Sequence, residues 1–246
     1  MNKTEQSPFL VPDWPAPGNV RAYSTTRLGG ASQGPFKSFN LGMHVGDDPE
    51  AVIHNRRRLP QSEQIVWMDQ VHGNHVIHLT PTSRQNQQAD AAIATEPGVS
   101  CAVMTADCLP VLLCRQGGTA VAAVHCGWRG LAAGILDNTL KVLPGTNSEY
   151  MAWLGPAIGS DAFEVGEDVR KMFPSISSAF KPAAQQGKYW ADIYAIAKSI
   201  LQHAGVMSVS GGEYCTYSDS RRYFSYRRDG KTGRMASVIW LSSDES

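Results

Sequence analysis

Apolar residues dominate three short stretches in the middle of the chain, residues 100–107, 109–115 and 119–126. Short apolar runs that are rich in Val, Ala, Leu and Cys and bounded by turn residues are typical of buried strands, so we predict three strands here. Side chains alternate along a strand. We therefore expect His125 and Cys126 to lie on opposite faces and to point to different sites.

The apolar spacing changes to a helical period after residue 127. Residues 127–145 place their leucine and isoleucine side chains on one face, which predicts a helix that follows the third strand directly. Residues 166–173 and 191–205 also have a helical pattern. Another helix is predicted to begin at Pro49, a residue suited to the first turn, with Asp48 as its N-cap.

Further β-rich runs lie toward the two ends of the chain. Residues 19–27 predict an early strand. Residues 64–79 predict a hairpin whose turn is Gly73-Asn74, and residues 221–241 predict a second hairpin that turns near Asp229-Gly230. Strands early and late with helices between them favour an α+β fold, with a mixed β-sheet flanked by helices, over a regular βαβ alternation.

Length and composition limit the possible classes of protein. The 246 residues contain no repeat and no low-complexity linker, so we expect a single domain over residues 1–246. Lys plus Arg equals Asp plus Glu at 22 each, which gives no reason to expect nucleic acid or a membrane surface as a partner. The N-terminus has no apolar core of a secretion signal, and no apolar run is long enough to span a membrane. Five cysteines without a CxxC pair predict reduced thiols in a cytoplasm.

Three potential metal ligands, His72, Cys108 and His125, each end a predicted strand. Two imidazoles and a thiolate suit zinc, and three protein ligands leave a position for water or substrate. Copper accepts the same donors. The same residues also fit a Cys–His hydrolase, with Cys108 as nucleophile, a histidine as base and Asp107 nearby. In a third interpretation Cys108 is a core cysteine and the histidines are ordinary polar residues.

Two other segments offer groups that bind a substrate. The start of the helix at residues 127–130 presents free N–H groups, and Arg129 adds donors for a phosphate or carboxylate. Alternatively, these glycines serve the turn and Arg129 makes a surface salt bridge. Residues 27–48 form a long glycine-rich loop, in which Arg27 and Asn40 have no local structural role and are candidates for ligand contact.

With these residues assembled, the chain resembles the laccase-domain (YfiH-like) family, whose members are described as purine nucleoside phosphorylases or peptidoglycan editing factors. The resemblance covers nearly the whole chain and is carried by TTRLGGAS (25–32), FNLGMHVGDD (39–48), QVHG (70–73), TADCLPVLL (105–113), HCGWRG (125–130), GPAIG (155–159) and FSYRRDGKTGR (224–234). It implies a single α+β domain with His72, Cys108 and His125 as metal ligands. Many members have alanine where this chain has Cys126, which is compatible with Cys126 facing away from the metal.

The resemblance implies zinc-dependent work on purine nucleosides, with copper as the other possible metal. The implied activities are phosphorolysis of adenosine, inosine, guanosine and methylthioadenosine to base and (methylthio)ribose 1-phosphate, and deamination of adenosine. The implied partners are a purine nucleoside and inorganic phosphate. Cys108, Asp107 and Arg129 are then the candidate catalytic residues, with Asp107 as a possible acid for the leaving purine. The candidate substrate-binding residues are Arg27, Asn40, Gln70 and Arg129.

Three other functions stay open. Some members of the family act in peptidoglycan editing, which would be an amide hydrolysis that removes a misincorporated serine from a UDP-MurNAc precursor. Others are described as copper polyphenol oxidases, but this chain lacks the multiple His-x-His clusters that a multicopper oxidase needs. A metal-stabilised binding protein without enzymatic activity is the third, and it predicts a closed fourth coordination position.

Overall fold

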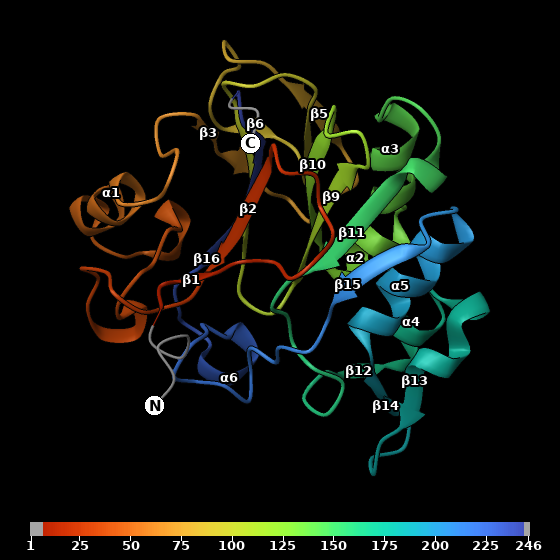
Figure 1. Cartoon of the computed structure of the whole chain (residues 1–246). Coiled ribbons are helices and arrows are strands. Elements are labelled where there is room, and N and C mark those ends of the chain that lie inside the picture. The colour runs from red at the N-terminus through yellow and green to blue at the C-terminus, as the bar shows by residue number, and fades with distance from the viewer. Residues whose placement is uncertain (1–6, 244–246) are drawn as a thin grey trace.

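Two β-sheets lie face to face at the centre of the computed structural model, which describes residues 7–243 (Figure 1). The five-stranded sheet has the order β1 (Phe9–Leu10), β2 (Val20–Thr25), β16 (Met235–Leu241), β8 (Ser100–Thr105) and β3 (Ile65–Val66). The six-stranded sheet has the order β15 (Ser208–Gly211), β11 (Tyr150–Leu154), β9 (Leu109–Arg115), β10 (Val121–Cys126), β7 (Ala91–Ala94) and β5 (Val76–Leu79). Both sheets are antiparallel in the middle and parallel at an edge, so both are mixed.

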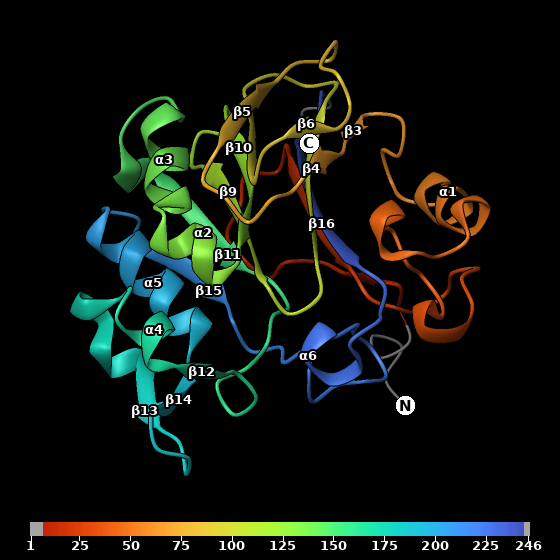
Figure 2. The same ribbon diagram turned by 180° about the vertical axis from the view of Figure 1, so that it is seen from behind.

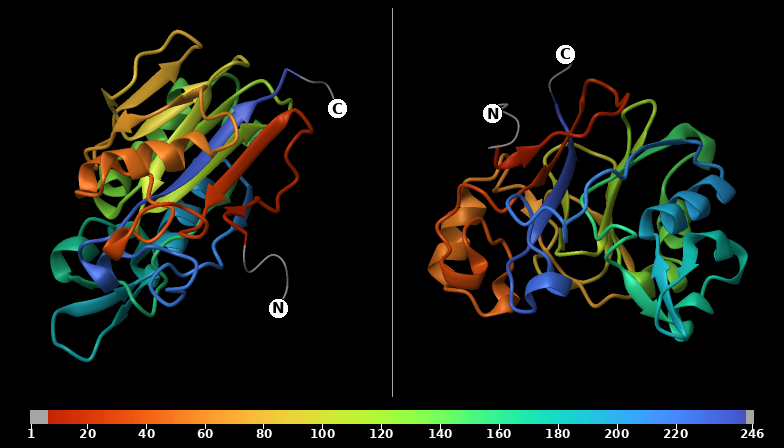
Figure 3. Two further views of the ribbon diagram at one scale, coloured as in Figure 1. Left: turned by 90° about the vertical axis from the view of Figure 1, so that its left-hand side faces the viewer. Right: turned by 90° about the horizontal axis from the view of Figure 1, so that it is seen from below.

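Helices and two small sheets surround this pair. The helices are α1 (Pro49–Arg57), α2 (Trp128–Ala132), α3 (Ile135–Val142), α4 (Glu167–Arg170), α5 (Ile193–His203) and α6 (Tyr226–Asp229). The small sheets pair β12 (Glu164–Gly166), β14 (Lys188–Ala191) and β13 (Phe180–Pro182), and β4 (Met68–Asp69) with β6 (Gln87–Gln88). Helices α2, α3 and α5 cover the outer face of the six-stranded sheet, and α1 lies beyond the five-stranded sheet on the other side (Figures 2 and 3).

The strand alternation predicted for residues 119–126 is confirmed. In β10, Ala122, Val124 and Cys126 belong to the core between the sheet and the helices. Val121 and Ala123 belong instead to the core between the two sheets. Strands buried on both faces are apolar throughout rather than alternating with polar residues. This explains why the central strands of the six-stranded sheet are recognisable from sequence as short apolar runs.

Three of the four predicted helices exist, and one of them is much shorter than expected. Helix α5 matches residues 191–205 closely, and α1 begins at Pro49 with the Asp48 side chain accepting the N–H of Glu50 at 3.1 Å. Residues 166–173 form only the one-turn helix α4. The continuous helix predicted over 127–145 is wrong, because Gly134 adopts a left-handed conformation (φ 82°) and divides the segment into α2 and α3.

Both predicted hairpins are wrong. In residues 64–79, β4 pairs with β6 and β5 pairs in parallel with β7, so the runs on either side of Gly73-Asn74 do not pair with each other. In residues 221–241 only β16 is a strand, and its partners are β2 and β8. The segment before it forms α6, which Ser225 caps by accepting the N–H of Arg228. In both cases pairing with distant strands overrides the local pattern.

The predicted fold class is confirmed: the chain is a single α+β domain with mixed sheets flanked by helices. The sandwich of two sheets is a feature that the sequence pattern did not predict. Within residues 7–243 no helix has the length and apolar character that crossing a membrane requires.

Candidate metal centre

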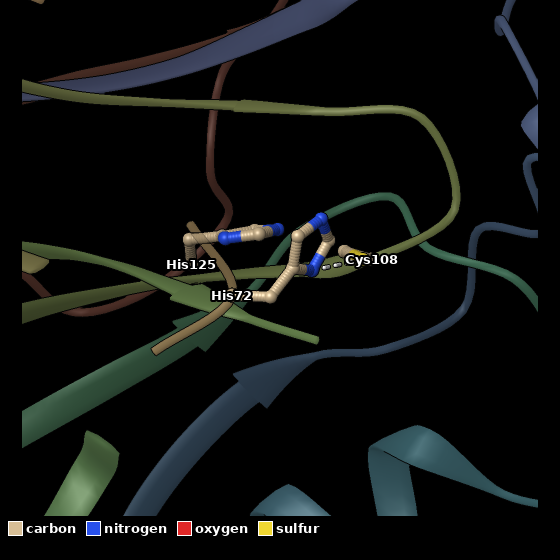
Figure 4. Close-up of side chains that lie close together, drawn as sticks. All are labelled: His72, Cys108 and His125. Atoms are coloured by element: carbon tan, nitrogen blue, oxygen red, sulfur yellow. Dashed lines mark hydrogen bonds between the residues drawn. The ribbon is translucent and has the colours of Figure 1, made fainter. Parts of the chain in front are cut away.

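The three predicted metal ligands meet in space (Figure 4). His72 lies in the loop after β4, Cys108 in the turn between β8 and β9, and His125 near the end of β10. Their ligand atoms all lie within 4.8 Å of one another, and Cys108 Sγ is 4.0 Å from His72 Nδ1. The two imidazole centroids are 4.7 Å apart. The donor set of two nitrogens and one sulfur suits zinc or copper, so these residues fit a metal ion.

The pKa shifts in this cluster favour a thiolate at Cys108 beside a protonated imidazole at His125, which loses its proton when a metal binds. Burial alone would raise the pKa of the Cys108 thiol, but the neighbouring His125 and His72 outweigh burial and lower that pKa to about 6. Burial alone would lower the pKa of His125, but Cys108 and Asp90 outweigh burial and raise it. Cys108 is therefore a thiolate at neutral pH, which is the form that both a metal ligand and a nucleophile require.

Asp90 joins two of the three ligand-bearing segments. Its Oδ1 lies 2.8 Å from His125 Nδ1 and accepts the N–H of His72 at 2.9 Å. Its Oδ2 accepts the N–H of Gly73 at 2.7 Å and that of Val71 at 3.3 Å. Burial would raise the pKa of this carboxyl, and the hydrogen bonds from His125 and from the loop lower it. Asp90 is therefore an ionised, buried carboxylate.

The metal-ligand cluster opens into a pocket of about 730 Å³. That volume is in the range of small-molecule sites, which are mostly apolar with a few polar groups. The apolar lining comes from Met68, Met104, Trp128, Ile158, Phe163, Ile193 and Tyr226. The polar lining beside the three ligands comes from His44, Asp69, Gln70, Asp107, Arg129, Arg227 and Arg234. One pocket thus offers an apolar wall, several cations and the metal-ligand cluster.

Comparison with known proteins identifies the family. A protein-family model described as "Multi-copper polyphenol oxidoreductase laccase" matches residues 21–242. The chain belongs to this laccase-domain family. The matched residues include the metal-ligand cluster and, apart from β1 and the first residue of β2, both sheets.

Relatives within the laccase-domain family are similar to this chain over nearly their full length. A protein of Pseudomonas aeruginosa named purine nucleoside phosphorylase is 52% identical over 239 residues, which is 95% of this chain and 98% of the relative. The Escherichia coli purine nucleoside phosphorylase YfiH is 49% identical over 241 residues, 96% of this chain and 99% of the relative. A crystal structure of Neisseria meningitidis protein NMB0706 has a TM-score of 0.93 and 50% identity, and it covers 96% of this chain and 100% of that one. YlmD from Geobacillus stearothermophilus has a TM-score of 0.91 at 31% identity, with 96% of this chain and 97% of that one covered.

Besides Cys108, three of the predicted substrate or catalytic residues line the pocket of this laccase-domain protein: Gln70, Asp107 and Arg129. The Gln70 side chain is bonded to the backbone of Met104 through both its oxygen (2.7 Å) and its nitrogen (3.0 Å), so it fixes β8 beside the loop of His72. Arg129 is exposed, and its guanidinium lies over the Trp128 ring at 4.5 Å. Within the described residues this guanidinium makes no hydrogen bond or ion pair, so it is available to a ligand.

Asp107 is buried and tied to the protein by both carboxylate oxygens. Oδ1 accepts the Thr216 hydroxyl at 2.6 Å, and Oδ2 accepts the N–H of Arg227 at 2.6 Å. Asp107 also has a positive φ of 92°, which is unusual for a non-glycine residue. These contacts hold the turn that presents Cys108.

Arg27 and Asn40 are not brought into the pocket. The Arg27 guanidinium donates to the carbonyls of Lys37 and Ser220 and lies over the Phe224 ring. Asn40 is fully buried, and its side-chain amide bonds to groups of Gly42, Asp47 and Arg234. The structure therefore gives both residues the local structural role that the sequence did not reveal.

Sequence reasoning did not single out Arg234, His44 or Asp90. Arg234 lines the pocket, and its NH1 donates to the carbonyls of Thr232 and Gly233. Burial lowers the pKa of Arg234, although Cys108 and Asp107 oppose that effect. Burial also lowers the pKa of His44, and the nearby Arg234 and Arg56 lower it further. Arg234 ends the motif FSYRRDGKTGR, and its place in a motif that carries the family resemblance is the signal that would have found it.

Proposed function

We propose that this chain is a metal-dependent purine nucleoside phosphorylase, with zinc as the ion held by His72, Cys108 and His125. The observation that carries the proposal is the pocket, in which the metal-ligand cluster, an apolar wall and three arginines line the same space. The names of the relatives from Pseudomonas aeruginosa and Escherichia coli support the same class of reaction. A zinc ion bound there would act as a Lewis acid toward the substrate or water.

The reaction would use the arginines for phosphate. In phosphorolysis an oxygen of inorganic phosphate forms a bond to C1′ of the ribose, the bond from C1′ to the purine nitrogen breaks, and the purine leaves with the bond's electrons and takes up a proton. Arg129 and Arg234 would hold the phosphate, because neither has a carboxylate within ion-pair distance in the described part of the chain. Arg27, a predicted substrate-binding residue, does not line the pocket, and its guanidinium donates to the carbonyls of Lys37 and Ser220.

The apolar wall would hold the purine. Tyr226, Trp128 and Phe163 offer ring faces on which a flat base can stack. The proposed substrates are adenosine, inosine, guanosine and methylthioadenosine, because the pocket offers more apolar surface than groups that would discriminate between purines. Deamination of adenosine is proposed as a second activity of the same site.

Asp107 is the proposed acid for the leaving purine, and its contacts make a second role possible. Both carboxylate oxygens already accept hydrogen bonds, so Asp107 also positions the turn of Cys108. An Asp107→Asn variant separates the two roles. An acid role predicts a loss of kcat for nucleosides that need protonation at the purine, with zinc content unchanged. A positioning role predicts loss of zinc.

A hydrolase acting through Cys108 is the second candidate function, because the thiol has a pKa of about 6 and two imidazole neighbours. Such a site fits amide hydrolysis of a peptidoglycan precursor. Oxidation by several copper ions is not favoured, because residues 7–243 contain a single cluster of His, Cys, Asp or Glu groups able to hold a metal. We also propose that the protein works in the cytoplasm, which agrees with five free cysteines.

The deciding experiment incubates metal-quantified protein with adenosine, with and without inorganic phosphate, and identifies products by mass. Adenine and ribose 1-phosphate that form only with phosphate are expected. Inosine in the absence of phosphate would establish the deaminase activity. Cys108→Ala and Arg129→Ala should both lose phosphorolysis. If the fully metallated protein forms neither product, the nucleoside proposal fails, and muropeptide precursors become the substrates to test for the hydrolase.

A further inference from the structure

Asp90 is buried immediately before β7 and has no solvent-exposed surface. We infer that Asp90 is the residue that positions both histidines of the metal centre, and that the centre does not bind zinc tightly without it. The inference rests on the metal site of the proposed function but not on the reaction carried out there. Asp90 touches neither pocket nor substrate, so it acts through the two histidines.

The contact with His125 sets which imidazole nitrogen faces the other ligands. Asp90 Oδ1 is 2.8 Å from Nδ1, and a carboxylate can only accept, so Nδ1 carries the proton. This leaves the lone pair of a neutral imidazole on Nε2, which is the nitrogen available to a metal. The backbone of Asp90 holds the same residue, because its carbonyl accepts the N–H of His125 at 2.7 Å.

The contacts with the loop set the position of His72. The N–H groups of Val71, His72 and Gly73 all point at the one carboxylate. His72 has a φ of 59°, a left-handed conformation that costs free energy for a residue other than glycine. Three hydrogen bonds to this one carboxylate hold the loop in that conformation. The two histidines reach the cluster from different elements, and Asp90 is the group that both of them share.

A neutral amide cannot replace this carboxylate. Asparagine has one accepting oxygen, whereas Asp90 accepts on both oxygens. With the amide oxygen toward His125, the NH2 group would face the N–H groups of Val71 and Gly73. With the amide turned over, the NH2 group would face His125 Nδ1 and would move the imidazole proton to Nε2, where it blocks the metal. Asp90→Asn therefore disturbs either the loop of His72 or the tautomer of His125. The side-chain volume at position 90 stays almost the same.

The test measures zinc affinity by competition with a chromophoric chelator, for the wild-type chain and for Asp90→Asn. Supporting contacts of this kind change metal affinity roughly 10- to 100-fold, and we expect a loss of that size. The matched control is Glu149→Gln, since Glu149 is another carboxylate that accepts a backbone N–H (Thr146, 2.6 Å) and an arginine (Arg115, 2.8 Å) but does not line the pocket. Thermal unfolding of the metal-free forms shows whether each variant is folded.

The absorption spectrum of bound cobalt(II) reports the ligand geometry, which a loss of folding stability alone does not change. Wild-type protein and Glu149→Gln should give the same visible d–d bands and the same thiolate-to-cobalt absorption from Cys108. Asp90→Asn should shift or weaken the d–d bands, because a histidine ligand is misplaced. Equal zinc affinity and equal cobalt spectra for Asp90→Asn and wild type would overturn the inference, whether or not the protein catalyses phosphorolysis of nucleosides.

A measurement on the unaltered protein decides the matter if Asp90→Asn does not fold. Proton–nitrogen correlation spectra of the imidazoles, recorded on the zinc-loaded wild-type chain, report which nitrogen of His125 carries a proton. We expect a slowly exchanging proton on Nδ1 and a metal-bound Nε2. A metal-bound Nδ1, or a His125 imidazole without a protected proton, would show that Asp90 does not set the tautomer.

Discussion

The chemical role of each cysteine in this chain depends on what surrounds its sulfur. Burial raises the pKa of Cys101 well above its usual range and that of Cys114 to about 12, so both stay protonated thiols in the core. The pKa of Cys108 is lowered to about 6 beside two imidazoles. Cysteine count and spacing carry none of this information, because the shift depends on neighbours that are distant in sequence.

We predict that metal-free protein is alkylated by iodoacetamide at Cys108 near neutral pH, while Cys101 and Cys114 stay unmodified. Only the thiolate reacts. The rate at Cys108 should therefore be low below pH 6 and rise to a plateau above it, whereas an ordinary thiol would reach its plateau only above pH 9. Peptide mapping by mass spectrometry resolves Cys108 from Cys215, which also has a lowered pKa. Zinc should protect Cys108, and a midpoint near 9 would contradict the prediction.

Arg234 supplies a second prediction at this scale. Arg234 lines the pocket, so Arg234→Gln should raise the KM for phosphate by about 10- to 100-fold, the effect of losing a hydrogen bond to a charged group. The KM for the nucleoside should change much less. Arg27→Gln is the matched control, since Arg27 binds backbone carbonyls outside the pocket. Steady-state kinetics with each substrate varied in turn measure both KM values. Equal KM values for phosphate in Arg234→Gln and Arg27→Gln would contradict the assignment.

At the scale of elements, the sequence predicted the helices and strands whose own residues show a periodic apolar pattern. Strands β8, β9 and β10 and helix α5 were recognised because burial on both faces, or on one helical face, leaves a periodic apolar trace. The hairpin predicted over residues 64–79 does not form, because β4 and β5 are short and pair with strands from residues 87–94 instead of with each other. The Gly73-Asn74 dipeptide resembles a hairpin turn, but its loop is closed by Asp90 rather than by strand pairing.

The start of α2 gives a prediction about an element. A Cβ on Gly127 would lie 3.0 Å from His72 Nδ1 and 3.2 Å from Cys108 Sγ. The backbone there is ordinary (φ −71°), so alanine is conformationally acceptable and only the contact matters. Gly127→Ala should therefore displace two ligands and weaken zinc binding by roughly tenfold or more, the scale of other ligand-supporting contacts.

The control for Gly127→Ala is Gly117→Ala, because a Cβ on Gly117 would meet no atom within 4 Å. Both variants should unfold at wild-type temperature without metal, and only Gly127→Ala should lose affinity in the chelator competition. Unchanged zinc affinity in Gly127→Ala would contradict the prediction, because it would mean that His72 and Cys108 keep their positions beside an added methyl group.

At the scale of the whole molecule, the pocket collects residues from seven separate parts of the chain, from His44 to Arg234. The sequence predicted His72, Cys108 and His125 because each combines a ligating side chain with the end of a strand or with a family motif. It did not predict Asp90 or Arg234, whose roles exist only once β7 and β16 are in place. Arg27 and Asn40 differ in the opposite way, since each is held by hydrogen bonds to a distant segment, at Ser220 and Arg234, that the local sequence does not reveal.

Because the three ligands come from three segments, a bound metal should stabilise the entire fold. A ligand that binds only the native state at about 1,000 times its Kd contributes about 4 kcal/mol to the free energy of unfolding. For a domain of this size each kcal/mol shifts the Tm by about 2–4 °C, so zinc should raise the Tm by roughly 8–16 °C over chelator-treated protein. Differential scanning calorimetry measures the shift, and Cys108→Ala should lose most of it. A full shift in Cys108→Ala would place the stabilising zinc at a site other than this centre.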